Sequence, residues 1–297
     1  MQAEPDVPVD RSVLDMCAEL APEPGLALDP NTVLADVGFD SLGCADLAVA
    51  IEERFGVRLP DAEVAEFKTV KEVASAVKAG VKARRERIPK DLGRSQLAAK
   101  RVVRPILAAY SRLRVEGEDN VPATGPVLIA PNHRSMFDIP IAVIAAPRRV
   151  FFMAKQELFG DPIRNRLWLE LGGFPVKRQI ADVRSVDTAS ALLEGGGALV
   201  IYPEGKRSKT AEMLPFLGGA AWLALRLGVP IVPCGVIGTG RHPGWDGKAA
   251  PWIGKHIRVA YGEPIRVERE PDPRTRRLKA EELTGHLLAA VNALLGP

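Results

Sequence analysis

A histidine and an aspartate lie five residues apart in the stretch NHRSMFD, residues 132–138. An imidazole titrates near neutral pH, and a carboxylate that holds it makes it a suitable general base. On an ideal helix this spacing separates the two side chains by about 140°, so His133 and Asp138 meet only if the chain turns between them. The apolar run VLIA before the stretch predicts a strand, and a strand-to-helix loop would supply that turn. A surface histidine beside a helix-capping aspartate is the alternative, because so short a pattern also occurs by chance.

A second candidate for chemistry is Ser41, in the stretch VGFDSLGCADL at residues 37–47. Apolar residues at helical spacing follow it, so a helix is predicted to begin there and to end at Gly56. Either Asp40 or Ser41 can cap that helix by accepting hydrogen bonds from its first N–H groups. The cap explains a serine at this position without any chemistry, so the surroundings must decide whether its hydroxyl does more.

Cations next to strands form the third group of candidates. The stretch GGFPVKRQ (172–179) contains Lys177 and Arg178, and GALVIYPEGKRSKT (197–210) is a buried strand followed by a polar turn. The turn contains Glu204, Gly205, Lys206 and Arg207. Arginines bind phosphates through charge-assisted hydrogen bonds, whereas the alternative is a solvated basic surface.

The elements that must position these residues fall into two domains. Residues 1–79 predict a compact all-α unit of four helices, at 11–21, from Ser41 to Phe55, at 61–67 and at 69–79. A charged linker over 80–94 follows, and residues 95–297 alternate strands and helices, as in an α/β domain. Residues 1–79 hold 16 Asp and Glu against 6 Lys and Arg, whereas the remainder holds 34 basic residues against 21 acidic ones. Such a split indicates two domains with different partners.

An amphipathic helix is predicted over residues 95–114. Its apolar residues follow helical spacing, and it carries flanking cations at Lys100, Arg101, Arg104, Arg112 and Arg114. Such a helix can lie in an anionic membrane surface, although a surface helix packed on its own domain is the alternative. Pro105 in its middle predicts a kink or two separate pieces. A closing helix is predicted over 276–295.

Several classes of function are not expected. Cys17, Cys44 and Cys234 are odd in number and lack metal-ligand spacing, so we expect reduced thiols in a cytosolic protein and no metal site. The N-terminus is acidic and predicts no secretory signal, and the longest apolar runs are about half of the roughly 20 residues that a membrane span needs. Nucleic-acid binding is not expected, because the basic surface comes without an array of stacking aromatics.

Residues 10–79 closely resemble an acyl carrier protein, and Gly38, Asp40, Ser41 and Leu42 fit its attachment motif. The resemblance implies that Ser41 bears a 4′-phosphopantetheine arm, whose thiol holds an acyl group as a thioester. A phosphopantetheinyl transferase and an acyl-loading enzyme are implied as partners. A phosphodiester at a helix N-terminus is also physically favoured.

Residues 97–296 resemble the glycerolipid acyltransferases, the family that includes lysophosphatidic acid acyltransferases. NHRSMFD matches the first motif of that family, FPVKR the second, YPEGKRS the third and VPIVP the fourth. The resemblance implies a mixed-sheet α/β fold and acyl transfer from acyl-CoA or an acyl carrier protein to a lipid hydroxyl. It implies that His133 is the base, that Asp138 orients it, and that no covalent enzyme intermediate forms.

The same resemblance implies the acceptor-binding residues. These would be Lys177, Arg178, Glu204, Gly205, Lys206 and Arg207. Lys206 replaces the threonine of the third motif, and Leu217 stands where the family often has a lysine. A bound phosphate can therefore sit differently here, or the acceptor need not be a glycerol phosphate.

Two functions of different classes follow. The first is an acyltransferase that moves a fatty acyl group from its own carrier domain, acyl-CoA or an acyl carrier protein to a lysophospholipid such as 1-acyl-glycerol-3-phosphate, or to a non-glycerolipid acceptor. The second is a carrier and docking module whose second domain only anchors it to a membrane. The intact His133–Asp138 pair favours the enzyme. We expect a cytoplasmic protein peripherally associated with the inner face of the membrane.

Overall fold

A computed structural model of the 297-residue chain describes most of its length. The described residues are 9–23, 25–58, 67–82, 88–89, 91–135, 137–176, 183–208, 212–239 and 256–296. They form two compact units. The first is Met1–Arg87 with Val176–Asp187 and Asp272–Arg277, and the second is Ile88–Pro175 with Thr188–Pro271 and Leu278–Pro297.

The first unit is helical, as the sequence predicts. It contains the helices α1 (Val9–Leu20), α2 (Ser41–Phe55) and α4 (Val70–Ala79), and the short antiparallel strands β1 (Val57–Arg58) and β2 (Val81–Lys82). Residues 61–66 of the helix expected over 61–67 lie outside the described residues, so the count of four helices stays a prediction. The structure confirms the predicted end of α2 and the predicted cap of α4. Gly56 ends α2 with φ of 62°, and the Thr69 side chain accepts from the Glu72 N–H at the start of α4.

The core of this unit comes from one face of each helix. Val13 and Cys17 of α1, Ile51 of α2 and Val73 of α4 are fully buried, because residues three and four apart share a helix face. Burial raises the pKa of the Cys17 thiol to about 12, so it acts as a small apolar residue. This packing fixes α2, and with it the start of that helix at Ser41.

Both ends of the expected linker belong to ordered structure. Val81 and Lys82 pair with β1 in the first unit. In the second unit, Leu92 is buried and the Gly93 N–H donates to the Leu169 carbonyl at 2.8 Å. Residues 83–90 lie between these two anchored stretches.

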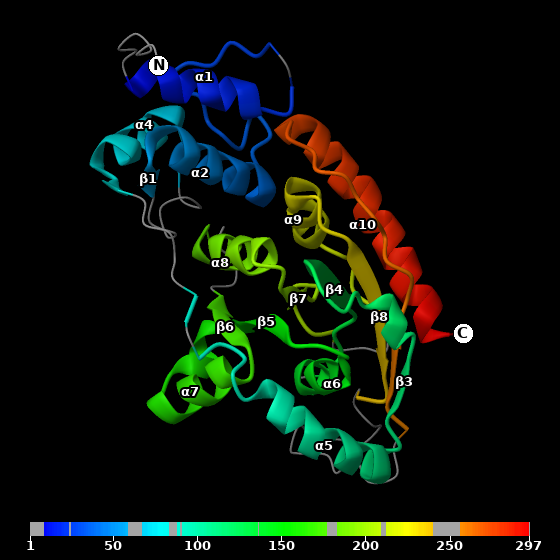
Figure 1. Ribbon diagram of the computed structural model, residues 1–297. Coiled ribbons are helices and arrows are strands. Elements are labelled where there is room, and N and C mark those ends of the chain that lie inside the picture. The colour runs from blue at the N-terminus through cyan, green and yellow to red at the C-terminus, as the bar shows by residue number, and fades with distance from the viewer. Residues whose placement is uncertain are drawn as a thin grey trace. The chain divides into compact units, whose positions relative to one another are not determined.

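The second unit is built on a mixed sheet of seven strands in the order β3-β9-β8-β4-β7-β5-β6 (Figure 1). The strands are β3 (Arg114–Glu116), β4 (Val127–Pro131), β5 (Val150–Lys155), β6 (Gly173–Val176), β7 (Ala198–Val200), β8 (Ile231–Ile237) and β9 (Arg258–Tyr261). β8 and β7 both pair with β4 in parallel, and β9 pairs with β8 in antiparallel. The α/β fold with a mixed sheet is therefore confirmed.

Helices connect and flank these strands. They are α5 (Gln96–Ser111), α6 (Asp138–Ala145), α7 (Pro162–Glu170), α8 (Val183–Glu194), α9 (Gly219–Leu227) and α10 (Pro273–Leu295), with short 3-10 turns η1 (Glu118–Asn120) and η2 (Gln156–Phe159). α10 confirms the closing helix predicted over 276–295. Among the described helices, none is long and apolar enough to span a membrane.

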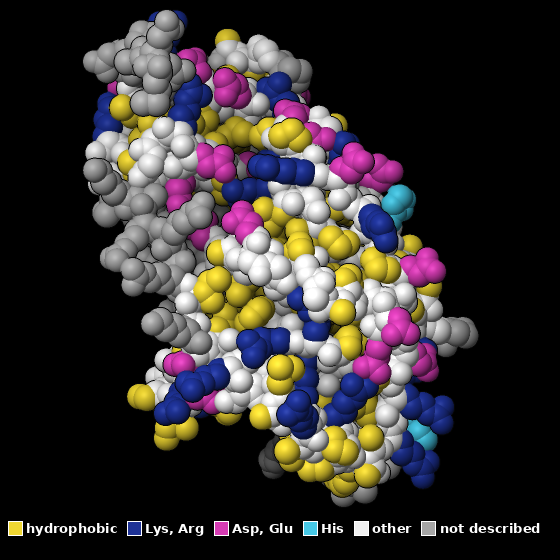
Figure 2. Space-filling model, viewed as in Figure 1, with side chains coloured by type: hydrophobic (Ala, Val, Ile, Leu, Met, Phe, Trp, Pro, Cys, Tyr) yellow, Lys and Arg dark blue, Asp and Glu magenta, His cyan; other side chains and the backbone are white. Residues whose placement is uncertain are grey.

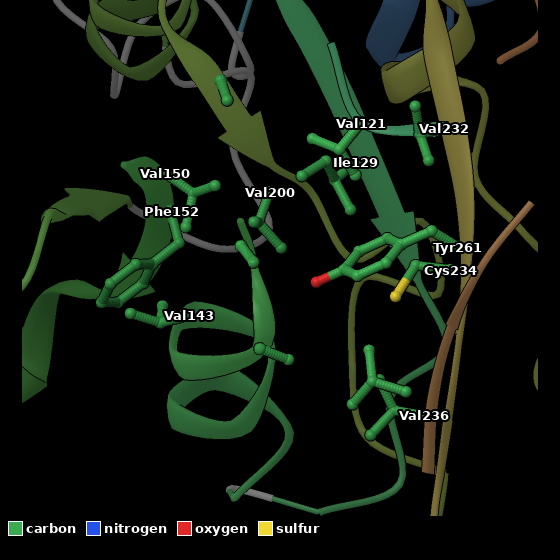
Figure 3. Close-up of a cluster of buried hydrophobic side chains, with 14 of the residues drawn as sticks. Val121, Ile129, Val143, Val150, Phe152, Val200, Val232, Cys234, Val236 and Tyr261 are labelled. Atoms are coloured by element: carbon green, nitrogen blue, oxygen red, sulfur yellow. The ribbon is translucent and has the colours of Figure 1, made fainter. Parts of the chain in front are cut away.

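The central strands read as unbroken apolar runs because both faces of the sheet are covered. All five residues of β4 and all three of β7 are buried. Figure 3 shows their side chains meeting those of β5, β8 and β9 in one cluster, with Phe152, Cys234 and Tyr261 among its members. Burial raises the pKa of the Cys234 thiol, as expected for a packing residue. The rigid centre of the sheet thus lies directly before the loop that holds His133.

α5 corresponds to the amphipathic helix predicted over 95–114. It runs through Pro105 as one helix, so the alternative of two pieces is wrong. Arg112 ends it with φ of 48°, and residues 114–116 join the sheet as β3. Its exposed face carries large apolar side chains, with Val102 62% and Ile106 59% exposed. Figure 2 shows basic and hydrophobic side chains close together in the lower part of the view, over α5 and α7.

Lys100 does not flank this exposed face, contrary to the prediction. It is buried, and its ammonium group donates to the carbonyls of Ala146 at 2.9 Å and Arg148 at 2.5 Å. Burial, followed by the neighbouring charge of Arg104, lowers the pKa of Lys100 to about 7. Lys100 therefore ties α5 to the chain after α6 and is not available to a lipid head group.

This lysine predicts a pH dependence of stability. The pKa of Lys100 is lower in the folded state than the unfolded value of about 10.4, so the unfolded chain binds more protons between these values. The free energy of unfolding should therefore rise with pH in this window, by up to about 1.4 kcal/mol per pH unit, and fall towards pH 7. Urea unfolding at pH 7.5 and pH 9.5 should show this rise for the wild-type chain relative to Lys100→Met. Equal pH dependence in both chains would contradict it.

Candidate active site

The loop between β4 and α6 brings His133 and Asp138 together. β4 ends at Pro131 and α6 begins at Asp138, so the chain turns between the two residues as the spacing requires. The Nδ1 atom of His133 lies 3.0 Å from Oδ2 of Asp138, and the two side chains are 4% and 0% exposed. A histidine and a carboxylate are thus paired at the end of a central strand.

The pairing fixes which ring nitrogen can act as a base. An ionised carboxylate only accepts hydrogen bonds, so Nδ1 of His133 must donate, and Nε2 of the neutral ring keeps its lone pair. The ring of Tyr202 packs on His133 with centroids 4.3 Å apart. Burial, followed by the charge of Asp138, raises the pKa of Tyr202 well above its usual value, so this phenol stays neutral.

The Asp138 carboxylate is held by donors on both oxygens. Oδ2 accepts from the N–H groups of Arg134 at 2.6 Å and Ser135 at 2.7 Å, in addition to His133. Oδ1 accepts from the hydroxyl of Thr239. A fully buried carboxylate is costly without such partners, and these donors also fix its direction. Asp138 is therefore aimed at the histidine.

The stretch YPEGKRS, residues 202–208, forms hydrogen bonds with the backbone of His133. The His133 N–H donates to Oε1 of Glu204 at 2.5 Å, and its carbonyl accepts from the Ser208 N–H at 2.9 Å. Oε2 of Glu204 accepts from the Leu214 N–H at 2.9 Å, and Glu204 is 3% exposed. Both oxygens of Glu204 thus accept from backbone N–H groups, one of them that of His133, and its expected role in binding the acceptor stays a prediction.

Three further residues that were expected to bind the acceptor lie in the same loop as Glu204. Gly205, Lys206 and Arg207 are exposed and lie between the two residues that hold the His133 backbone. Gly205 has φ of 65°, and a Cβ there would lie 2.6 Å from the Leu217 side chain, so this turn favours glycine. Lys177 and Arg178 lie outside the described residues.

Sequence reasoning missed several residues of this site. The side-chain amide of Asn132 is fully buried, donates to the Val236 carbonyl at 3.1 Å and accepts from the Val236 N–H at 2.7 Å. Asn132, Tyr202 and Thr239 each lie just beyond the carboxyl end of β4, β7 or β8, which are neighbours in the sheet. That position was the available signal, because ligands of open α/β sheets bind outside the carboxyl ends of the strands.

The N-terminus of α2 shows which residue caps this helix. Asp40 is the cap: its side chain accepts from the N–H groups of Leu42 at 3.0 Å and Gly43 at 2.9 Å. Ser41 is the first residue of the helix, which therefore needs no cap from it. Cys44 is half-buried against the core of this unit, and burial raises its pKa, in line with a small packing residue.

The surroundings of Ser41 fit an attached phosphodiester. Within the first unit, the guanidinium of Arg277 lies 2.6 Å from Oδ2 of Asp40 and 3.2 Å from the Gly38 carbonyl. The dipole of a helix favours a negative group at its N-terminus, and Arg277 offsets the charge of the Asp40 cap beside it. The residues present are thus compatible with a phosphopantetheine arm on the serine that starts the helix.

Two family models match separate parts of the chain. Residues 112–237 match the family model described as Acyltransferase. Residues 11–77 match the model described as Phosphopantetheine attachment site. The first match contains His133 and Asp138, and the second contains Ser41.

Individual relatives match the second domain. A protein of Bacillus subtilis named 1-acyl-sn-glycerol-3-phosphate acyltransferase is 30% identical over 161 residues, which are 54% of this chain and 77% of that protein. A protein of the same name from Cocos nucifera is 31% identical over 140 residues, 46% of this chain and 45% of its own length. The chain thus spans less than half the length of some curated relatives that it matches.

Among solved structures, the 1-acyl-sn-glycerophosphate acyltransferase PlsC of Thermotoga maritima matches with a TM-score of 0.49 and 24% identity, over 65% of this chain and 78% of that one. The 77% coverage of the Bacillus subtilis relative and the family models agree on the assignment. The chain therefore belongs to the acyltransferase family that includes the 1-acyl-sn-glycerol-3-phosphate acyltransferases, and it carries a phosphopantetheine-attachment domain at its N-terminal end.

Proposed function

We propose that this chain transfers a fatty acyl group from a thioester to the hydroxyl of a lysophospholipid such as 1-acyl-glycerol-3-phosphate. The observation that carries the proposal is the buried His133–Asp138 pair, in which Nδ1 donates and Nε2 keeps its lone pair. The family membership and the printed names of several relatives support the same reaction.

The proposed chemistry needs one base and no covalent enzyme intermediate. Nε2 of His133 accepts the proton of the acceptor hydroxyl while its oxygen attacks the thioester carbonyl. Asp138 stabilises the imidazolium that forms, as an orienting carboxylate does in a catalytic triad. The new C–O bond forms, the C–S bond breaks, and the imidazolium returns its proton to the departing thiolate.

We propose that a phosphate of the acceptor is bound by the exposed cations after Tyr202. Lys206 and Arg207 follow Glu204, which holds the His133 backbone, so a phosphate bound there would place its hydroxyl near the base. Lys177 and Arg178 are proposed to add to this group. Leu217 is 61% exposed, and it departs from the motif of the resembled family, so uncharged acceptors should be tested as well.

We also propose that Ser41 carries 4′-phosphopantetheine. When bound, this group supplies a thiol that holds the acyl chain as a thioester. A phosphopantetheinyl transferase would attach it and a separate enzyme would load it, while acyl-CoA and an acyl carrier protein remain further donors. Asp40 as the helix cap and Arg277 beside it support this role of the serine.

A product assay tests the reaction. The purified chain is given lysophosphatidic acid or a long-chain alcohol, with acyl-CoA or an acyl-loaded carrier as the donor. We expect phosphatidic acid to form with at least one donor. Ester formation with the alcohol alone would move the acceptor away from glycerol phosphates. No ester with any pair would refute the enzyme and favour the carrier and docking module.

We further propose that α5 docks the chain on the inner, anionic face of a membrane, in keeping with a peripheral cytoplasmic protein. The exposed side chains of Leu97, Val102, Ile106 and Tyr110 would enter the interface. Arg101 is exposed on the same helix and would meet anionic head groups, a contribution of about 1 kcal/mol that weakens with salt.

This surface predicts the effect of two substitutions. The double variant Val102→Asp/Ile106→Asp should bind anionic phospholipid vesicles at least about tenfold more weakly, because two apolar groups of about 1 kcal/mol or more each are lost. Cosedimentation with vesicles at low and high salt measures the affinity. Leu278→Asp is the matched control, since Leu278 is 69% exposed on α10. Equal binding of the double variant and the control would contradict a role for α5.

A further inference from the structure

Thr239 contacts the catalytic pair from outside all four sequence motifs. It lies two residues beyond the end of β8, it is 5% exposed, and its hydroxyl donates to Oδ1 of Asp138. The two residues are 101 positions apart in the sequence. A buried threonine hydroxyl is thus directed at the carboxylate that orients His133.

The hydroxyl completes the hydrogen bonding of Asp138. Oδ2 accepts from His133, Arg134 and Ser135, whereas Oδ1 accepts from Thr239. The terminal torsion of an aspartate is soft, so its carboxylate can turn unless both oxygens are bound. The Thr239 hydroxyl opposes that rotation and keeps Oδ2 against Nδ1 of the histidine.

The backbone before Thr239 is built to place it. Gly238 has φ of 89°, and a Cβ at this residue would lie 2.2 Å from the His256 carbonyl, so only glycine fits. Two residues earlier, Val236 exchanges hydrogen bonds with Asn132, next to the catalytic histidine. β8 is therefore fixed to the catalytic loop at Asn132, and the hydroxyl of Thr239 is fixed in the same frame.

From this geometry we infer that Thr239 is a positioning residue for the transfer reaction: it locks the Asp138 carboxylate and thereby holds His133 with Nδ1 protonated and Nε2 free. The inference rests on the proposed function for its effect on rate, but the state of the His133 ring can be observed without any substrate. It also assigns a role to the segment that follows the fourth motif.

Two substitutions at this position separate the hydroxyl from the volume of the side chain. Thr239→Val keeps the shape but leaves Oδ1 of Asp138 without this donor, and we expect kcat to fall roughly 10- to 100-fold with little change in KM. Thr239→Ser retains the hydroxyl and should keep most of the activity. Thr188→Val is the matched control, because Thr188 is similarly buried, at 8% exposure, on α8.

The second readout is the NMR signal of the histidine ring nitrogens in the full-length chain, with His133 identified by its loss in His133→Ala. We expect the Nδ1-protonated form in the wild type, Thr239→Ser and Thr188→Val, and a mixture of ring forms in Thr239→Val. A wild-type ring pattern in a folded Thr239→Val variant would overturn the inference, even if no substrate has been found. If Thr239→Val does not fold, Thr239→Ser decides: a loss as large as that expected for valine would overturn it, and retained activity and ring pattern would support it.

Discussion

Replacing His133 with alanine is expected to lower the rate of acyl transfer by roughly 10²- to 10⁴-fold, the usual effect of removing a general base. The acceptor hydroxyl would lose the only group that we assign to accept its proton, while the proposed cation site at Lys206 and Arg207 stays in place. Initial rates with saturating acyl-CoA and lysophosphatidic acid measure the loss. Binding of lysophosphatidic acid to the variant should survive, since the base contributes to the transition state rather than to ground-state affinity.

His286→Ala is the matched control for this substitution. His286 is exposed on α10, so its loss should leave the rate and the thermal midpoint near those of the wild type. His133→Ala must also keep its fold, because the imidazole packs on Tyr202 and its removal leaves a small buried space. A folded His133→Ala variant with near-normal activity would eliminate His133 as the base.

Replacing Ser41 with alanine is expected to abolish attachment of the phosphopantetheine arm. Incubation with a phosphopantetheinyl transferase and coenzyme A should add one arm to the wild-type chain and none to Ser41→Ala, as read from the intact mass. The reason is chemical: alanine has no hydroxyl to form the phosphodiester, whereas Asp40 still caps α2 and keeps the helix.

The control for this variant lies in the same unit. Ser75 is exposed on α4 and its hydroxyl donates to the Lys71 carbonyl at 2.8 Å, so Ser75→Ala should accept the arm normally. An arm on folded Ser41→Ala would show that another residue is modified. A wild-type chain that never gains an arm would remove the carrier role altogether.

The variants His133→Ala and Ser41→Ala together test whether the carrier domain delivers its acyl group to the active site of its own chain. Two domains joined in one chain can meet at effective concentrations of up to about the millimolar range. Transfer within one molecule predicts that a mixture of acyl-loaded His133→Ala and Ser41→Ala at low micromolar concentration forms little product. Full rescue on mixing would show that the carrier acts between molecules.

The sequence predicted those parts of the molecule that depend on short-range patterns. The turn between His133 and Asp138 follows from their spacing and from the apolar run of β4, and the cap at Thr69 and the end at Gly56 follow from local residue types. The helical period placed α5 correctly. It could not show which side of the helix the domain covers, so Lys100 was assigned to the wrong face.

The parts that were missed depend on contacts between distant residues. Asn132 bonds to Val236 across 104 positions, and Thr239 reaches Asp138 across 101 positions, and only the pairing of β4 with β8 brings them together. For Glu204, the resemblance to the acyltransferase family implies acceptor binding and says nothing of a contact with the His133 backbone. Its contact with the His133 N–H depends on the fold of the loop after β7, which no local pattern specifies.

The most direct test of the account is a single turnover of the full-length chain loaded with an acyl group on its arm. Lysophosphatidic acid is added, and the intact mass of the protein and the lipid products are followed by mass spectrometry. We expect the wild-type chain to lose the acyl mass as phosphatidic acid appears, and loaded His133→Ala to keep its acyl group under the same conditions. A wild-type chain that keeps its acyl group, or a His133→Ala chain that delivers it equally fast, would contradict the account.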